Sequence, residues 1–93
     1  MGSILTVTAN THNATEDIET YLCDTTSNNV RIYLPNTTNM GQLFICKIIE
    51  ASNDMDVTTP GGTVTIDGAT NQNTSTLNTT FRCLFDGANY QLI

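Results

Sequence analysis

Few residues of this chain have side chains that could perform catalysis. Nucleophilic catalysis needs a nucleophile beside a base, and the sequence holds one histidine, His12, within the polar segment NTHNAT. A lone histidine in such a segment is expected to be solvated. The other candidate nucleophiles are the three cysteines, Cys23, Cys46 and Cys83.

Each cysteine lies inside an apolar run: YLCD, LFICKII and FRCLF. A free cysteine behaves as a small buried hydrophobe, and wide spacing beside a single histidine does not suit a zinc site. An odd number of cysteines without a C-x-x-C pair suits assembly in a reducing cytoplasm. We therefore predict a protein that is not an enzyme, with no catalytic residue, no metal site and no cofactor.

Two carboxylates are close enough in sequence to consider as a pair. Asp54 and Asp56 flank Met55, so in a strand both point away from the face that Met55 occupies. Such a pair can serve acid–base chemistry or bind calcium, but DMD lacks the glycine and the spaced oxygen ligands of a calcium loop. Because close like charges normally stay in water, we interpret the pair as part of a solvated outer face.

Ligand binding by aromatic and amide side chains is the remaining chemistry. Glycan sites combine aromatic rings with amide and carboxylate hydrogen bonds, and the tyrosines and the Asn-rich loops of this chain could supply both, although no motif identifies a pocket. The candidate ligand-binding residues are Tyr33, Asn36, Asn39, Asn71, Asn73, Asn89 and Tyr90.

The composition restricts the class of partner. The formal charge is −6 and 13% of residues are charged, about half the usual share. Thr and Asn supply the polar surface instead, which is typical of all-β surface or fibre proteins. The negative charge argues against nucleic acid or an anionic membrane as partner. No apolar run approaches the 18 residues that would predict membrane insertion.

The elements that position these residues are predicted to be strands, because apolar and polar residues alternate with a period of two. We expect a small antiparallel β-sandwich or jelly-roll-like domain of about eight short strands. Residues 1–19 would form an N-terminal strand and an acidic connector, with 1–3 a remnant of cloning, and residues 20–93 the main β domain. The expected strands are 4–8, 20–23, 29–34, 43–49, 55–58, 63–66, 80–85 and 90–93.

The strand expected at 43–49 is apolar on both faces. One face joins the expected core, which Leu77 would cap. The other is predicted to be an interface between subunits, with a covering loop as the alternative, and by alternation we place Tyr33 and the basic residues on it. The predicted interface residues are Leu43, Ile45, Ile49 and Leu84, and the basic residues are Arg31, Lys47 and Arg82. The expected core consists of Val30, Ile32, Leu34, Phe44, Cys46, Ile48, Met55, Val57, Val64, Ile66, Phe81, Cys83, Phe85, Tyr90 and Leu92.

Over residues 20–93 the chain resembles a domain common in tail fibres and fibre-like virion proteins of phages and large DNA viruses. The resemblance rests on a strand ending in Leu-Pro, a Gly before an Ile-Lys-like strand, an IDG turn and a closing DG-x-x-aromatic-x-Leu-Ile hairpin. The matching positions are Leu34-Pro35, Gly41, Lys47, Ile66-Asp67-Gly68, Asp86-Gly87, Tyr90 and Leu92-Ile93.

The resemblance implies a non-enzymatic fibre or knob module on the virion surface, a homotrimer that attaches to a host-surface glycan or receptor. Together with the strand that is apolar on both faces, it leads us to expect the binding surface on loops 35–41, 67–76 and 86–89. The alternative is a structural trimerisation or capping module without a ligand. Two departures stand out: Tyr90 replaces the usual Trp, and three cysteines replace Val, Ile or Leu. The cysteines fit assembly in a reducing host cytoplasm and favour a large eukaryotic virus over a phage.

Overall fold

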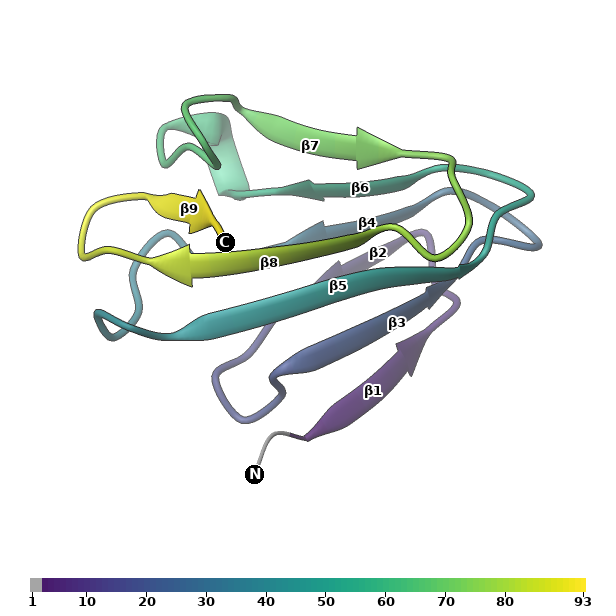
Figure 1. Ribbon diagram of the computed structural model, residues 1–93, viewed down its shortest axis with the longest axis horizontal. Coiled ribbons are helices and arrows are strands. Elements are labelled where there is room, and N and C mark those ends of the chain that lie inside the picture. Colours follow the sequence, from purple (N-terminus) through teal and green to yellow (C-terminus); the bar gives the residue numbers. More distant parts are fainter. Residues whose placement is uncertain (1–2) are drawn as a thin grey trace.

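The computed structural model describes residues 3–93, which form nine strands in two stacked sheets (Figure 1). The all-β class and the two-layer architecture that we predicted are confirmed. Sheet A contains, in spatial order, β1 (Ile4–Val7), β3 (Thr20–Asp24), β5 (Leu43–Glu50), β8 (Thr80–Phe85) and β9 (Tyr90–Leu92). Sheet B contains β2 (Thr11–Asn13), β4 (Val30–Tyr33), β6 (Met55–Thr58) and β7 (Asn71–Thr74).

The first six strands alternate between the sheets, so each turn of the chain adds one strand to both. We call such a turn a coil; the coils are β1–β2, β3–β4 and β5–β6. Neighbouring coils pair in parallel, β1 with β3 and β3 with β5 in sheet A, and β2 with β4 and β4 with β6 in sheet B. Parallel neighbours need a long crossover, and here the strand in the opposite sheet provides it.

Antiparallel pairing is confined to the C-terminal part, where β5 pairs with β8, β8 with β9 and β6 with β7. The prediction of an antiparallel, jelly-roll-like domain is therefore wrong for the three coils. The reason is that a period of two determines which side chains are buried and carries no information on the direction of the neighbouring strand.

Two strands were missed and one was predicted wrongly. β2 and β7 have the sequences THN and NQNT, which lack the apolar alternation of a half-buried strand. The segment 63–66 is no strand. It follows a 3-10 turn at Pro60–Gly62, in which Gly61 and Gly62 have positive φ, and β6 pairs with β7 instead of with this segment.

The N-terminal segment belongs to the same sandwich as the rest of the described chain, because β1 and β2 pair with β3 and β4. His12 points inward from β2 and its ring lies 5.5 Å from that of Tyr21 between centroids. The expectation of a solvated histidine is therefore wrong. Residues 16–17 form a turn, and within residues 3–93 no helix is long and apolar enough to cross a membrane.

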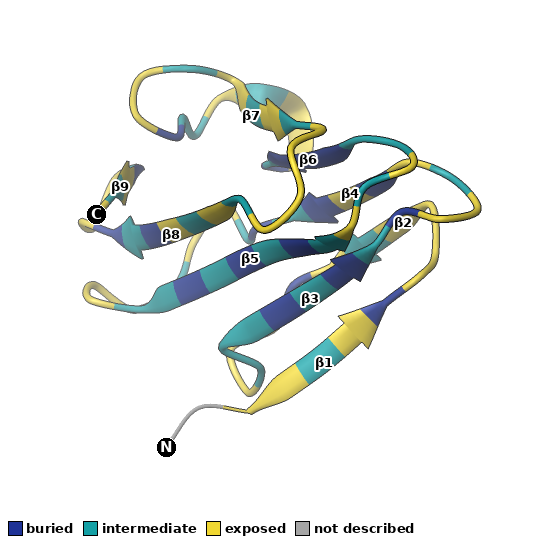
Figure 2. Cartoon of the chain, turned by 45° about the vertical axis from the view of Figure 1, so that its right-hand side comes forward, coloured by how far each residue is buried: buried dark blue, intermediate teal, exposed yellow. Residues whose placement is uncertain are grey.

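The core lies between the sheets, where buried positions alternate along β3, β4 and β5 (Figure 2). Most predicted core residues are buried, whereas Val64, Phe81 and Leu92 pack only partly against the core. Tyr21 is fully buried as well, although it was not among the predicted core residues. Leu77 is 52% exposed, so it does not cap the core.

The three cysteines are buried and free, as predicted. Burial raises the pKa of Cys23 to about 12, and burial together with the charge of Asp67 raises that of Cys83 to about 12. The pKa of Cys46 is also raised, chiefly by burial. These thiols are therefore protonated at neutral pH and contribute to packing.

Candidate functional site

The outer face of sheet B carries two transverse rows of polar side chains, because its four strands are in register. At these positions alternate residues of each strand point away from the core. The first row is Thr11, Arg31, Asp56 and Asn73, and the second is Asn13, Tyr33, Thr58 and Asn71.

Asp56 is the centre of this face. Its Oδ2 accepts a hydrogen bond from Arg31 Nε at 2.9 Å, and its Oδ1 accepts from Asn71 Nδ2 at 2.5 Å and Asn73 Nδ2 at 3.3 Å. Asp56 is only 7% exposed. Our interpretation of Asp54 and Asp56 as an equivalent solvated pair is therefore wrong for Asp56, because residues from β4 and β7 enclose its carboxylate.

Arg31 makes the one ion pair found within residues 3–93, and half of its side chain remains exposed. The nearby Tyr33 hydroxyl and the Asp56 carboxylate raise the pKa of Arg31 further above its usual value. The guanidinium is thus permanently charged and held in place by Asp56. It leaves further N–H donors for a ligand, since Nε alone bonds Asp56.

Two hollows of about 190 and 370 Å³ flank the Arg31–Asp56 pair, and both are lined by these two residues. We call them together the sheet B groove. The smaller hollow extends over Asn10 and Asp54, and the larger one over Tyr33 and the 3-10 turn. The groove therefore combines one guanidinium, two carboxylates, several amides and hydroxyls, and an aromatic ring, all of which hydrogen-bond or stack with polyols.

Three of the predicted ligand-binding residues, Tyr33, Asn71 and Asn73, meet in this groove. Asn36 lies beside it and donates from Nδ2 to the carbonyl of Pro60 at 3.0 Å. Asn39 lies outside it, in the turn before β5, where its carbonyl accepts from the N–H of Gln42.

Asn89 and Tyr90 both make hydrogen bonds within the domain, and the prediction that Tyr90 contacts a ligand is wrong because this side chain is buried. Asn89 Oδ1 accepts from the N–H of Thr65 at 2.9 Å. Tyr90 is fully buried and its hydroxyl donates to the carbonyl of Pro35 at 2.7 Å. Tyr90 is therefore not free to contact a ligand, whereas Asn89 remains partly exposed.

The sequence reading missed Asn10 and Thr11, and it assigned Arg31 and Asp56 no joint role. Asn10 directly precedes β2, and the other three residues lie on β2, β4 and β6, which are neighbours only through parallel pairing. The sequence did contain a hint that these two residues could pair. Arg31 and Asp56 carry opposite charges, and each lies on the polar side of a strand whose alternate residues are apolar. Without the strand order, however, that hint does not identify partners.

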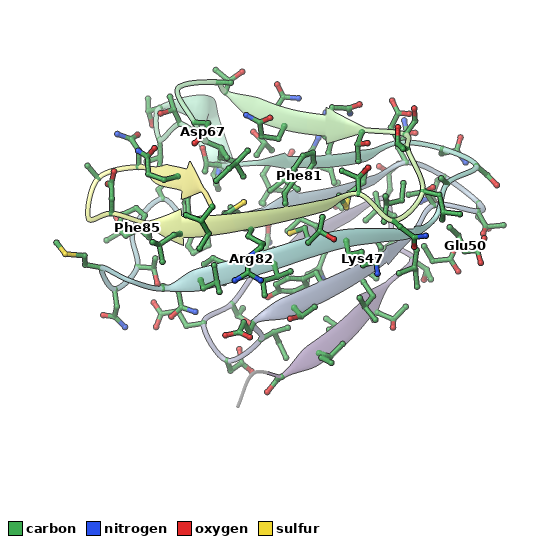
Figure 3. The ribbon with its side chains drawn as sticks, viewed as in Figure 1. Lys47, Glu50, Asp67, Phe81, Arg82 and Phe85 are labelled. Carbon is green, nitrogen blue, oxygen red and sulfur yellow. The ribbon has the colours of Figure 1, made fainter. Side chains whose placement is uncertain are left out.

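The outer face of sheet A mixes apolar side chains with Thr residues and two cations. Leu43, Ile45, Ile49 and Leu84 are all partly exposed there, and Leu43 pairs directly with Leu84. Figure 3 shows Lys47 and Arg82 on β5 and β8, the front sheet of that view. The expectation that Arg31 and Tyr33 share this face is wrong, because they lie on the opposite side of the sandwich.

Within residues 3–93, no cluster of three or more His, Cys, Asp or Glu side chains is placed to hold a metal ion. Comparison with protein-family models finds no match, and comparison with curated proteins finds none either.

Proposed function

We propose that this chain is a non-enzymatic fibre or knob module of a virion, a homotrimer that attaches to a host-surface glycan. The observation that carries the proposal is the contrast between the two outer faces. Sheet B has a polar groove with a partly exposed aromatic residue, and sheet A presents a patch of partly exposed Leu and Ile side chains on β5 and β8. One face suits ligand binding and the other suits assembly.

The groove favours a neutral, hydroxyl-rich ligand. Asp56 neutralises Arg31, and Asp54 adds a further carboxylate at the end of the groove. The chain as a whole carries a formal charge of −6, so an anionic glycan would be repelled. The exposed N–H groups of Arg31 and the groove amides supply the donors, and Tyr33 supplies a ring on which a sugar can stack.

The apolar face of sheet A supports the trimer. A two-layer sandwich normally has wet outer faces, yet the central strand β5 places Leu43, Ile45 and Ile49 on this one. Packing three such faces around an axis would remove them from water. Lys47 and Arg82 would then pair with acidic groups of a neighbouring subunit.

A structural trimerisation or capping module without a ligand is the second candidate. The observation that favours it is that both oxygens of Asp56 are already occupied by Arg31, Asn71 and Asn73. In that case the groove residues stabilise sheet B, and host binding resides in another part of the particle.

Binding to an array of neutral and sialylated glycans tests the attachment function. We expect neutral glycans to bind, and Tyr33→Ala to weaken binding about tenfold through the loss of aromatic stacking. Tyr33→Phe keeps the ring and is the matched control, expected to bind nearly as well. An intact trimer that binds no glycan would favour the structural module.

Light scattering at micromolar concentration tests the trimer. Ile45→Asp places a charge on the apolar face of sheet A, and we expect it to reduce the number of chains per particle threefold. Thr70→Asp, on an exposed residue beside sheet B, adds the same charge away from that face and should leave the number unchanged. If Ile45→Asp keeps the native size, the interface lies elsewhere.

A further inference from the structure

The two ends of sheet A differ in how their backbone groups are satisfied. At β9, the N–H of Tyr90 donates to the carbonyl of Thr65, and the carbonyl of Tyr90 accepts from the N–H of Asp67. The N–H of Leu92 donates to Asp67 Oδ1 at 2.8 Å. The segment around Asp67 therefore covers this edge, which protects it against pairing with another chain.

The opposite end has no such cover. In Figure 1, β1 lies at the free end of the front sheet, and β2 holds the corresponding place in sheet B. Within residues 3–93, no strand pairs with the outer side of either one. The first coil thus presents two open edges, one in each sheet.

The hydrogen bonds of the first coil identify which backbone groups point outward. Thr20 N–H donates to the carbonyl of Ser3, and Ala14 N–H donates to that of Tyr33. Successive residues of a strand direct their backbone groups to opposite sides. The N–H and C=O groups of Ile4 and Thr6 in β1, and of Thr11 and Asn13 in β2, therefore point away from the sandwich.

The sequence of this coil lacks the charged residues and prolines that commonly protect an edge. Residues 3–15 hold no Asp, Glu, Lys, Arg or Pro, the residue types that keep natural edge strands from pairing. Ile4 is 66% exposed, and Leu5 and Ile18 pack only partly against this end of the core. A further layer would cover these side chains as well as the free backbone groups.

We propose that the first coil pairs edge to edge with the first coil of a second copy of this chain. A partner must offer two open edges separated by the distance between the stacked sheets, about 10 Å. A single extended peptide satisfies only one of them. A second copy satisfies both when it is related by a two-fold axis perpendicular to the sheets, which makes β1 antiparallel to its counterpart and β2 antiparallel to its own.

This contact uses a different surface from the proposed trimer interface, so it doubles the number of chains whatever that number is. Thr6→Pro combined with Asn13→Pro tests it, because each proline removes an outward N–H that bonds nothing inside the domain, a position where edge strands tolerate proline. Thr6→Ser with Asn13→Ser keeps both N–H groups and is the matched control.

We expect light scattering to show half as many chains per particle for the proline variant as for the native protein, and no change for the serine variant. Equal sizes for the native and proline proteins would overturn the proposal. If Ile45→Asp has fewer chains per particle and the proline variant does not, the interface on the face of sheet A is supported and the edge contact is not. If Ile45→Asp has fewer chains per particle, that result by itself leaves the edge contact in place.

Amide hydrogen exchange on the native protein gives a test that does not depend on a variant folding. The outward amides of Thr6, Thr11 and Asn13 should be protected at micromolar concentration and lose protection on dilution. Rapid exchange of all three amides at every concentration would mean that the edge is unpaired. That result would contradict the proposal even if the particle contained several chains.

Discussion

Tyr33 and Tyr90 are the same residue type in different surroundings, because Tyr33 lies on an outer face and Tyr90 lies in the core. Tyr33 lies on the outer face of sheet B in the groove, whereas Tyr90 is fully buried and packs against Phe85 with ring centroids 5.0 Å apart. Both were predicted to bind ligand, because a sequence pattern does not reveal which aromatic ring becomes buried.

Tyr90→Phe therefore tests a structural hydrogen bond. The change leaves the carbonyl of Pro35 without its 2.7 Å donor, so we expect the free energy of unfolding in urea to fall by about 1 kcal/mol. Tyr33→Phe is the matched control and should change the stability by less than about 0.5 kcal/mol. An unchanged free energy of unfolding in Tyr90→Phe would show that this hydrogen bond contributes nothing to stability.

The cysteines predict an alkaline limit to stability. Burial raises the pKa of Cys23 and Cys83 to about 12 from an ordinary value near 9. Above pH 9 the unfolded chain loses thiol protons that the folded chain keeps, so stability falls with rising pH until about pH 12. The slope is about 1.4 kcal/mol per pH unit for each such thiol.

Urea unfolding between pH 8 and pH 11 measures this slope. Cys83→Val removes one titrating group, so its stability should decline less steeply than that of the native protein, whatever its absolute value at pH 8. Identical slopes would mean that the Cys83 thiol does not titrate differently in the folded and unfolded chains.

At the level of elements, the closing hairpin was predictable and its cover was not. The DGAN turn between β8 and β9 forms as predicted, with Asp86 Oδ1 accepting from the N–H groups of Ala88 and Asn89 at 2.9 Å. The contact between Asp67 and the outer side of β9 joins residues 25 positions apart. No local pattern encodes a contact of that kind.

Asp67→Ala tests that cover. It removes the acceptor of the Leu92 N–H and places Ala at a positive φ of 53°, so we expect a loss of about 1–3 kcal/mol and faster hydrogen exchange in β9. Asp67→Asn keeps an acceptor at a position that Asn tolerates, and it should retain most of the stability. Unchanged exchange of the Leu92 amide in Asp67→Ala would contradict this account of the edge.

Strand prediction succeeded where apolar alternation was long and failed where tertiary pairing decided the outcome. β5 and β8 were predicted from LFICKII and FRCLF almost to the residue. β2 and β7 are strands only because β4 and β6 offer them edges. The parallel order of the coils was likewise not predictable, since it depends on which sheet each successive strand enters.

For the whole molecule, the candidate site was likewise only partly predictable, because it depends on the order of the strands in space. Tyr33, Asn71 and Asn73 were predicted as ligand-binding residues from their residue types alone. Their convergence on Arg31 and Asp56 depends on the spatial order β2–β4–β6–β7, which the sequence pattern does not specify. The division of the sandwich into a polar groove and an apolar face is therefore a property of the assembled fold.

Titration of the ¹⁵N-labelled protein with mannose, galactose, glucose and N-acetylglucosamine, each at millimolar concentration, tests the central claim that the sheet B groove binds a neutral sugar. We predict amide shifts for at least one sugar that cluster around Arg31, Asp56 and Asn71, with none on the outer face of sheet A. The absence of shifts with all four sugars, or shifts confined to sheet A, would contradict the claim.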